Sequence, residues 1–119
     1  MGQPARFQEI LRRLAIIDET CVEDQTGIRL GRSTSQLLDS KTAALVRIGA
    51  LAATGSPAVC LEWSTGRALA AGATEDEIAD VLLAIAPVAG LSRIVAAAPE
   101  VGAALEYDVE AALEEPAGP

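Results

Sequence analysis

The chain has 119 residues, half of them apolar, yet only 3% are aromatic. That length makes one domain, and the shortage of bulky side chains suggests that some apolar helix faces meet another subunit. The formal charge of −8, from 17 acidic and 9 basic residues, argues against a nucleic-acid partner, because phosphate binding needs a concentrated basic surface.

Membrane insertion and metal binding are also disfavoured by the sequence. No run approaches the roughly 18 to 20 apolar residues of a spanning helix, and the N-terminus lacks a signal peptide's order of regions. We therefore expect no membrane association and a cytoplasmic location. The chain has no histidine, and Cys21 and Cys60 match no metal-ligand spacing. We expect two reduced thiols, no metal and no cofactor.

The N-terminal region reads as two helices and a loop. Apolar residues recur at helical spacing from Pro4, at positions 7, 10, 11, 14 and 17, which predicts an amphipathic helix. Asp18 is expected to cap a short second helix that carries Cys21, interpreted as a packing residue, and ends at Gly27. Residues 27–37 have no sustained period, so they form a loop that either covers a site or only connects two helices.

An apolar helix is predicted next, with Asp39 as its cap. Its body, AALVRIGALAA, is apolar nearly all the way round, which is typical of a helix in the middle of a molecule. Arg47 is its only charged residue. That guanidinium must reach solvent, pair with an acid or face a cavity that receives an anion, because a buried unpaired charge is very costly.

Two further helices have clear end signals. The first is expected to begin with Ser56 as its cap and Pro57 in its first turn. The second begins at Thr74, which forms a capping box with Glu77, and is expected to stop at Pro87. Its buried stripe is formed by apolar residues at helical spacing: Ile78, Val81, Leu82 and Ile85.

The C-terminal part is also helical. Residues 91–98 form an Ala-rich helix that Pro99 is expected to interrupt. Residues 100–115 add one or two short helices, with Asp108 as a cap, and residues 116–119 form a disordered tail. No strand pattern emerges, so the sequence predicts an all-α fold of six or seven helices.

One face of the helix that follows Ser56 carries reactive side chains. At about 100° per residue, Cys60, Ser64 and Arg67 lie on one line, with Trp63 beside them. Such a face can line a pocket; the alternative is a packed thiol, a capping hydroxyl and a surface arginine. We hypothesise that Cys60 and Ser64 are catalytic. The substrate-binding candidates are Arg47, Arg67 and Trp63.

Three stretches of the chain are distinctive: LDSKTAALVRIGALAATGSP, RALAAGATEDEIADVLLAIAPVAG and LEYDVEAAL. They resemble the carboxymuconolactone decarboxylase family, which also includes the alkyl hydroperoxidase D branch. The resemblance covers residues 38–98 well, within a single domain over residues 1–115. It implies an all-α fold around a central helical hairpin, with subunits assembled as trimers or hexamers and pockets near their contacts.

The chain departs from both branches at the positions that carry chemistry. The peroxidase branch has CxxCxxxH, with a glutamate twelve residues before the first cysteine. The corresponding positions here are Pro57, Cys60, Ser64 and Leu45. The decarboxylase branch has a histidine where Ser64 stands, so similarity of fold does not settle function.

Three functions therefore remain open, and the sequence does not decide whether the chain is an enzyme. The first is a decarboxylase-like (lyase) protein that acts on or binds a small organic acid, either a lactone or an aromatic acid. The second is a thiol-dependent peroxidase, with peroxiredoxin activity, that uses Cys60 together with Cys21 or an outside thiol. The third is a non-catalytic protein that binds a ligand or a partner.

Overall fold

The computed structural model describes residues 2–30 and 37–115, and the regular secondary structure in these ranges is helical throughout. The prediction of an all-α fold with six or seven helices is confirmed. Residues 31–36 of the predicted loop and 116–119 of the predicted tail lie outside the described residues. In chain order the helices are α1 (Arg6–Ala15), α2 (Glu19–Thr26), α3 (Ser40–Thr54), α4 (Ala58–Ala70), α5 (Glu75–Ala89), α6 (Leu91–Ala104) and α7 (Val109–Glu114).

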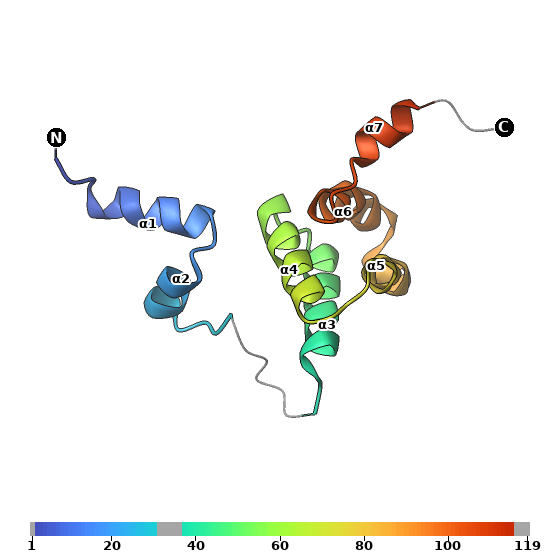
Figure 1. Cartoon of the computed structure of the whole chain (residues 1–119), viewed down its shortest axis with the longest axis horizontal. Helices are drawn as coiled ribbons and strands as arrows, with labels where there is room; N and C mark the ends of the chain where they lie inside the picture. The colour runs from blue at the N-terminus through green and yellow to red at the C-terminus, as the bar shows by residue number, and fades with distance from the viewer. Residues whose placement is uncertain (1, 31–36, 116–119) are drawn as a thin grey trace.

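Helix α3 lies in the middle of a four-helix core, as its apolar sequence predicts. It contacts α4, α5 and α6, and the latter three also contact one another (Figure 1). Small residues let these helices approach closely. A Cβ atom added to Gly49 of α3 would lie 3.2 Å from Ile85 and 3.3 Å from Val81 of α5. The largest buried apolar side chains of this core are Ile48, Leu61, Ile78, Leu82 and Val101.

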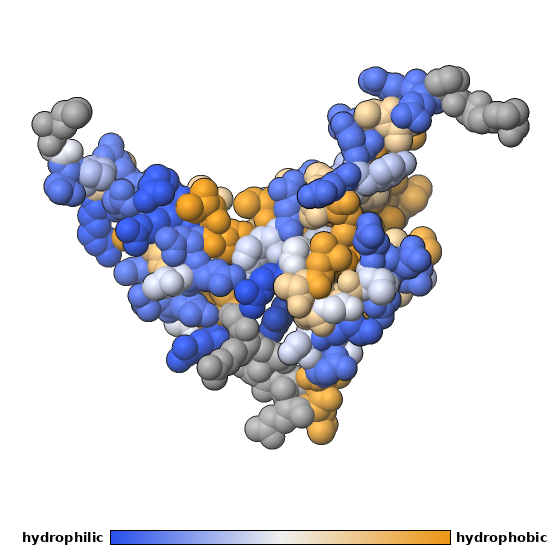
Figure 2. All heavy atoms as spheres, in the orientation of Figure 1, coloured by the Kyte–Doolittle hydropathy of each residue, from blue (hydrophilic) through white to orange (hydrophobic). Residues whose placement is uncertain are grey.

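Two parts of the chain extend from this core. Helix α1 packs on α2 alone, and α7 packs on α6 alone (Figure 1). The molecule measures 60 × 43 × 25 Å, with a radius of gyration of 16.7 Å. A compact chain of this length has a radius of about 13 Å. The extended arms give the molecule an open V shape, which Figure 2 also shows.

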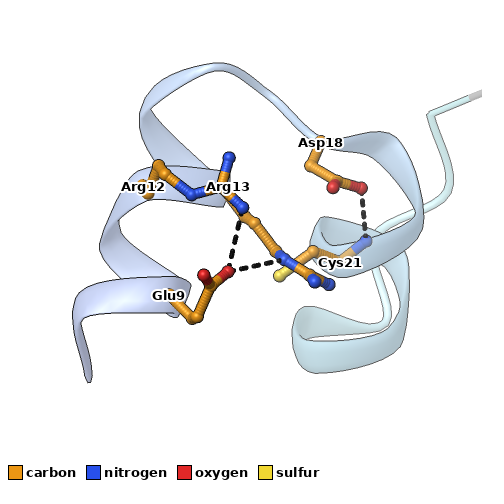
Figure 3. Close-up of polar contacts among 5 residues, drawn as sticks. All are labelled: Glu9, Arg12, Arg13, Asp18 and Cys21. Carbon is orange, nitrogen blue, oxygen red and sulfur yellow. Dashed lines mark hydrogen bonds and ion pairs between the residues drawn. The ribbon is translucent and has the colours of Figure 1, made fainter. Parts of the chain in front are cut away.

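Short-range polar contacts lie within α1 and at the start of α2 (Figure 3). Glu9 accepts hydrogen bonds from Arg12 and Arg13 at 2.9 and 3.3 Å, and the bond from Arg12 is the main reason that the pKa of Glu9 is lowered. Asp18 accepts from the backbone N–H of Cys21 at 3.1 Å, which confirms it as the cap of α2. The first helix ends at Ala15 rather than including position 17 as predicted.

The early end of α1 has a conformational cause. Ile17 adopts a left-handed backbone conformation with φ of 52°, which is incompatible with a continuing right-handed helix. Its side chain is half-buried in the corner. The apolar spacing alone carries no information on this backbone reversal, so the predicted helix was too long.

Three other helix starts agree with the sequence. Asp39 accepts from the Thr42 N–H at 2.7 Å, and Asp108 accepts from the Ala111 N–H at 3.0 Å. Thr74 accepts from the Glu77 N–H at 3.0 Å, while the Glu77 carboxylate accepts from the Thr74 N–H at 2.9 Å. The predicted capping box is therefore confirmed.

The predicted start of α4 is wrong by one position. Pro57 is itself the residue before the helix, with an extended ψ of 153°, and no side chain caps this end. The Ser56 hydroxyl lies instead 3.4 Å from the Thr54 hydroxyl. Because Pro57 is extended, Ser56 is one residue too far from the first turn to serve as its cap.

The two predicted proline breaks are also wrong. Helix α5 continues past Pro87 to Ala89, and α6 continues through Pro99 to Ala104. A proline inside a helix leaves the carbonyl four residues earlier without its N–H partner. These carbonyls belong to Leu83 and Val95, which are exposed residues, so water can take the place of the missing donor.

Within the described ranges, the helices are too short or too polar for any of them to traverse a lipid bilayer.

Candidate functional site

The site residues predicted on α4 all lie on that helix, and they differ in accessibility. Ser64 is buried, whereas Cys60, Trp63 and Arg67 are half-buried. Cys60 lies in the first turn of α4, and Ser64 lies one turn further along. Both cysteines are free thiols, and Cys21 is buried in α2. Arg47 comes from the neighbouring helix α3 and is half-buried there.

Trp63 and Arg67 are brought together with a third residue, Glu19 of α2. The indole Nε1 of Trp63 and the Nη1 of Arg67 each donate to the same carboxylate oxygen, Oε1 of Glu19, at 3.2 Å. The Arg67 guanidinium also lies 5.7 Å from the centre of the Trp63 ring, within range of a cation–π interaction. We call these three residues the Glu19–Trp63–Arg67 cluster. It connects the α1–α2 arm to the four-helix core.

Glu19 was missed at the sequence level because its partners are far away along the chain. It lies 44 residues before Trp63 and 48 before Arg67. At its own position it reads only as an acidic residue in the first turn of α2, where the helix dipole favours negative charge. No local pattern connects it with α4.

A cavity of about 340 Å³ lies where α3 ends and α4 and α6 begin. Its polar lining comes from Ser56, Ser92, Arg93 and Glu100. The Arg93 guanidinium packs against Gly55, which has a positive φ of 73° and leaves no room there for a side chain. The predicted site residues Cys60, Ser64, Trp63, Arg67 and Arg47 do not line this cavity.

Beside Ser64, the hydroxyl of Thr65 is fully buried in α4 and has no hydrogen-bond partner among the described residues. A buried hydroxyl without a partner is destabilising. Among residues 2–30 and 37–115, no group of three His, Cys, Asp or Glu side chains is placed to hold a metal ion.

The fold and this face define a class: an all-α protein whose core is built on the antiparallel pair α3 and α4, with polar side chains on one side of α4. The model of the carboxymuconolactone decarboxylase family matches residues 27–103, which is more than half of the chain. The protein therefore belongs to that family. No curated protein and no solved structure gave a significant match.

Proposed function

We propose that this carboxymuconolactone decarboxylase-like protein binds, or acts on, a small organic acid beside the polar face of α4. The observation that supports this most directly is the position of the Arg67 guanidinium over the Trp63 ring. A guanidinium pairs with a carboxylate in a fixed planar geometry, and an indole offers a flat apolar surface. Together they match an acid with a lactone or aromatic ring.

The remaining candidate residues have roles that follow from their chemistry. Arg47 of α3 is the second cation proposed to anchor the acid. Loss of carbon dioxide leaves an electron pair that a neighbouring carbonyl takes up as an enolate, which must then be protonated. Cys60, or a water held by Ser64, is the proposed proton donor. If the chain is not an enzyme, the same residues bind the acid without this step.

Glu19 has a distinct part in this proposal. Its carboxylate already accepts a hydrogen bond from Arg67, as the carboxylate of a ligand would. An incoming acid therefore has to compete with Glu19 for the guanidinium. Removal of the Glu19 charge should favour the acid, while removal of the Arg67 charge should abolish its anchor.

The proposal includes a homo-oligomer, either a trimer or a hexamer, and a cytoplasmic location. The family resemblance supports the oligomer, and the two free thiols are compatible with a reducing compartment.

Trp63 is the only tryptophan of the chain, so its fluorescence reports directly on the proposed site. We would titrate the protein with benzoate and with a γ-lactone carboxylate, using benzamide as the uncharged control. Arg67→Gln should weaken binding of both acids by about tenfold or more, the loss expected for one charge-assisted hydrogen bond. Glu19→Gln should tighten it.

Arg93→Gln is the matched control, because Arg93 lines the separate 340 Å³ cavity. This variant should bind the acids as the parent does. The proposed site is wrong if neither acid changes the Trp63 emission or the thermal midpoint. It is equally wrong if Arg67→Gln binds both acids with the parent's affinity. Release of carbon dioxide from the lactone acid then separates an enzyme from a binding protein.

A further inference from the structure

The chain exposes far more surface than a compact protein of its mass. Its accessible surface is 8307 Å², whereas a folded monomer of 12.2 kDa exposes about 6,000 Å². The excess of roughly 2,000 Å² exceeds the approximately 800 Å² that each partner contributes to a standard protein interface. Figure 2 shows hydrophobic side chains on the inner side of the α1–α2 arm, next to the open notch.

Helix α1 carries an apolar face that stays largely exposed among the described residues. Its three anchors follow the i, i+4, i+7 spacing of one helix face: Phe7, Leu11 and Leu14. Phe7 is 63% exposed and Leu11 is 60% exposed, and α1 has no buried residue. Within the chain α1 contacts α2 alone. This is the pattern of a helix that docks in a groove.

An apolar groove lies between α3 and α5, on a part of the core that α1 of the same chain does not contact. We call it the α3–α5 groove. Its volume is about 520 Å³, and only Thr42 among its lining residues has a polar side chain. Gly49, which also lines the groove, lets α3 and α5 approach closely at this point, because a Cβ atom there would meet Val81 and Ile85 of α5. Its walls include Leu45, Val46, Val81, Ile85 and Val88.

The helix and the groove match in length and in charge. Ten residues of α1 span about 15 Å, and the groove follows α3 from Thr42 to Ala53, a similar distance at 1.5 Å per residue. Helix α1 has three arginines and one glutamate, so it is positive in a chain whose net charge is −8. Exposed Asp80 of α5 immediately precedes Val81 of the groove.

We propose that α1 of one copy docks in the α3–α5 groove of a second copy. Each copy then donates one helix and receives one, and such a contact forms a symmetric ring when the rotation between copies closes. Phe7, Leu11 and Leu14 fill the groove, and the positively charged α1 lies beside Asp80 of α5. This contact gives the homo-oligomer of the proposed function a specific interface, and to that extent it rests on the proposed function. It uses no residue of the proposed organic-acid site, so acid binding and assembly are tested by separate measurements.

The first test is the mass of the full chain in solution, measured by light scattering. The parent should exceed the monomer mass of 12.2 kDa. Leu11→Glu on α1 and Val46→Glu in the groove should each reduce it to the monomer mass, with unchanged circular dichroism. Both side chains are exposed in the single chain, so neither change should prevent folding. Leu113→Glu, on the exposed face of α7, should leave the assembly intact.

The second test locates the contact directly. In a background with both native cysteines changed to serine, a Leu11→Cys chain and a Val46→Cys chain are mixed and oxidised with copper phenanthroline. A mixed disulfide dimer should form, and Leu113→Cys should give none with Val46→Cys. A monomeric parent overturns the proposal, as does an oligomer that survives either glutamate variant. The proposal is also overturned if a cysteine at position 7, 11 or 14 never forms a disulfide with the cysteine at position 46.

Discussion

The Arg67 guanidinium lies over the ring of Trp63, one turn earlier on α4, and both side chains donate to the Glu19 carboxylate of α2. A salt bridge, an indole hydrogen bond and a cation–π contact thus meet at one point. Helix α2 is linked by these contacts to a core with which it has no extensive backbone packing. The Glu19–Trp63–Arg67 cluster consequently affects both the proposed site and the position of the N-terminal arm.

Glu19→Ala should loosen the α1–α2 arm while leaving the core folded. The change removes both side-chain links to α4, so amide hydrogen exchange in α2 should accelerate and Trp63 emission should shift to the red. The free energy of unfolding should fall by less than about 1 kcal/mol, because the Arg67 and Glu19 side chains are 38% and 40% exposed. Asp24→Ala, elsewhere on α2, is the control. Unchanged exchange in α2 would show that the cluster does not hold the arm.

Thr65→Val should stabilise the protein. Valine has nearly the shape of threonine, and its methyl group replaces a hydroxyl that is fully buried without a described partner. The free energy of unfolding should rise by about 1 kcal/mol, as measured by urea denaturation followed by circular dichroism. Thr74→Val provides the opposite control, since it removes the cap of α5 and should cost about 1 kcal/mol. A less stable Thr65→Val variant would mean that the hydroxyl is satisfied in solution.

Acid should weaken the helix starts of α3 and α5. The backbone N–H of Thr42 lowers the pKa of Asp39 below its ordinary value of 3.8. The backbone N–H of Thr74, together with the Lys41 side chain, lowers the pKa of Glu77 below its ordinary value of 4.5. When the pKa of a carboxyl group is lower in the folded state than in the unfolded state, its stabilisation is complete at pH values above the unfolded-state pKa. That stabilisation is lost as the pH falls through the folded-state pKa. Stability should therefore decrease as pH falls below about 4.5.

The variant Glu77→Gln tests this dependence. Urea denaturation between pH 7 and pH 3 should show a flatter acid limb than in the parent, because one of the carboxyl groups with a lowered pKa is gone. Lys41→Gln should flatten the limb less, since Lys41 is the second cause of the Glu77 shift. An acid limb that is identical in Glu77→Gln and in the parent would refute the assignment.

The two thiols should differ in reactivity. Cys60 is half-buried, whereas Cys21 is only 8% exposed and must wait for local opening of the arm. Iodoacetamide should therefore modify Cys60 before Cys21, which intact mass can follow in Cys21→Ser and Cys60→Ser variants. Equal rates would contradict the burial of Cys21.

The same two variants examine the peroxidase alternative. Stoichiometric peroxide should oxidise Cys60 first, to a sulfenic acid with release of water, and a dithiol should reverse the change. If Cys60 stays inert to peroxide, the peroxidase alternative is excluded and the organic-acid proposal is unaffected.

Several features of the fold were predictable because they depend on residues close together in the chain. The Asp18, Asp39 and Asp108 caps and the box of Thr74 with Glu77 each connect residues three positions apart. The apolar body of α3 likewise predicts its central position. Helical periodicity also placed Cys60, Ser64 and Arg67 in line on one helix, and the structure has all three on α4, where their role stays a prediction.

The tertiary structure decided what local spacing cannot express. Glu19 joins Trp63 and Arg67 only because the chain folds back over more than 40 residues. The helices continue through Pro87 and Pro99 because the residues four positions earlier are exposed to water, which is a property of packing. Helix α1 is amphipathic by sequence, but only the three-dimensional arrangement shows that its contact with α2 leaves Phe7 and Leu11 exposed.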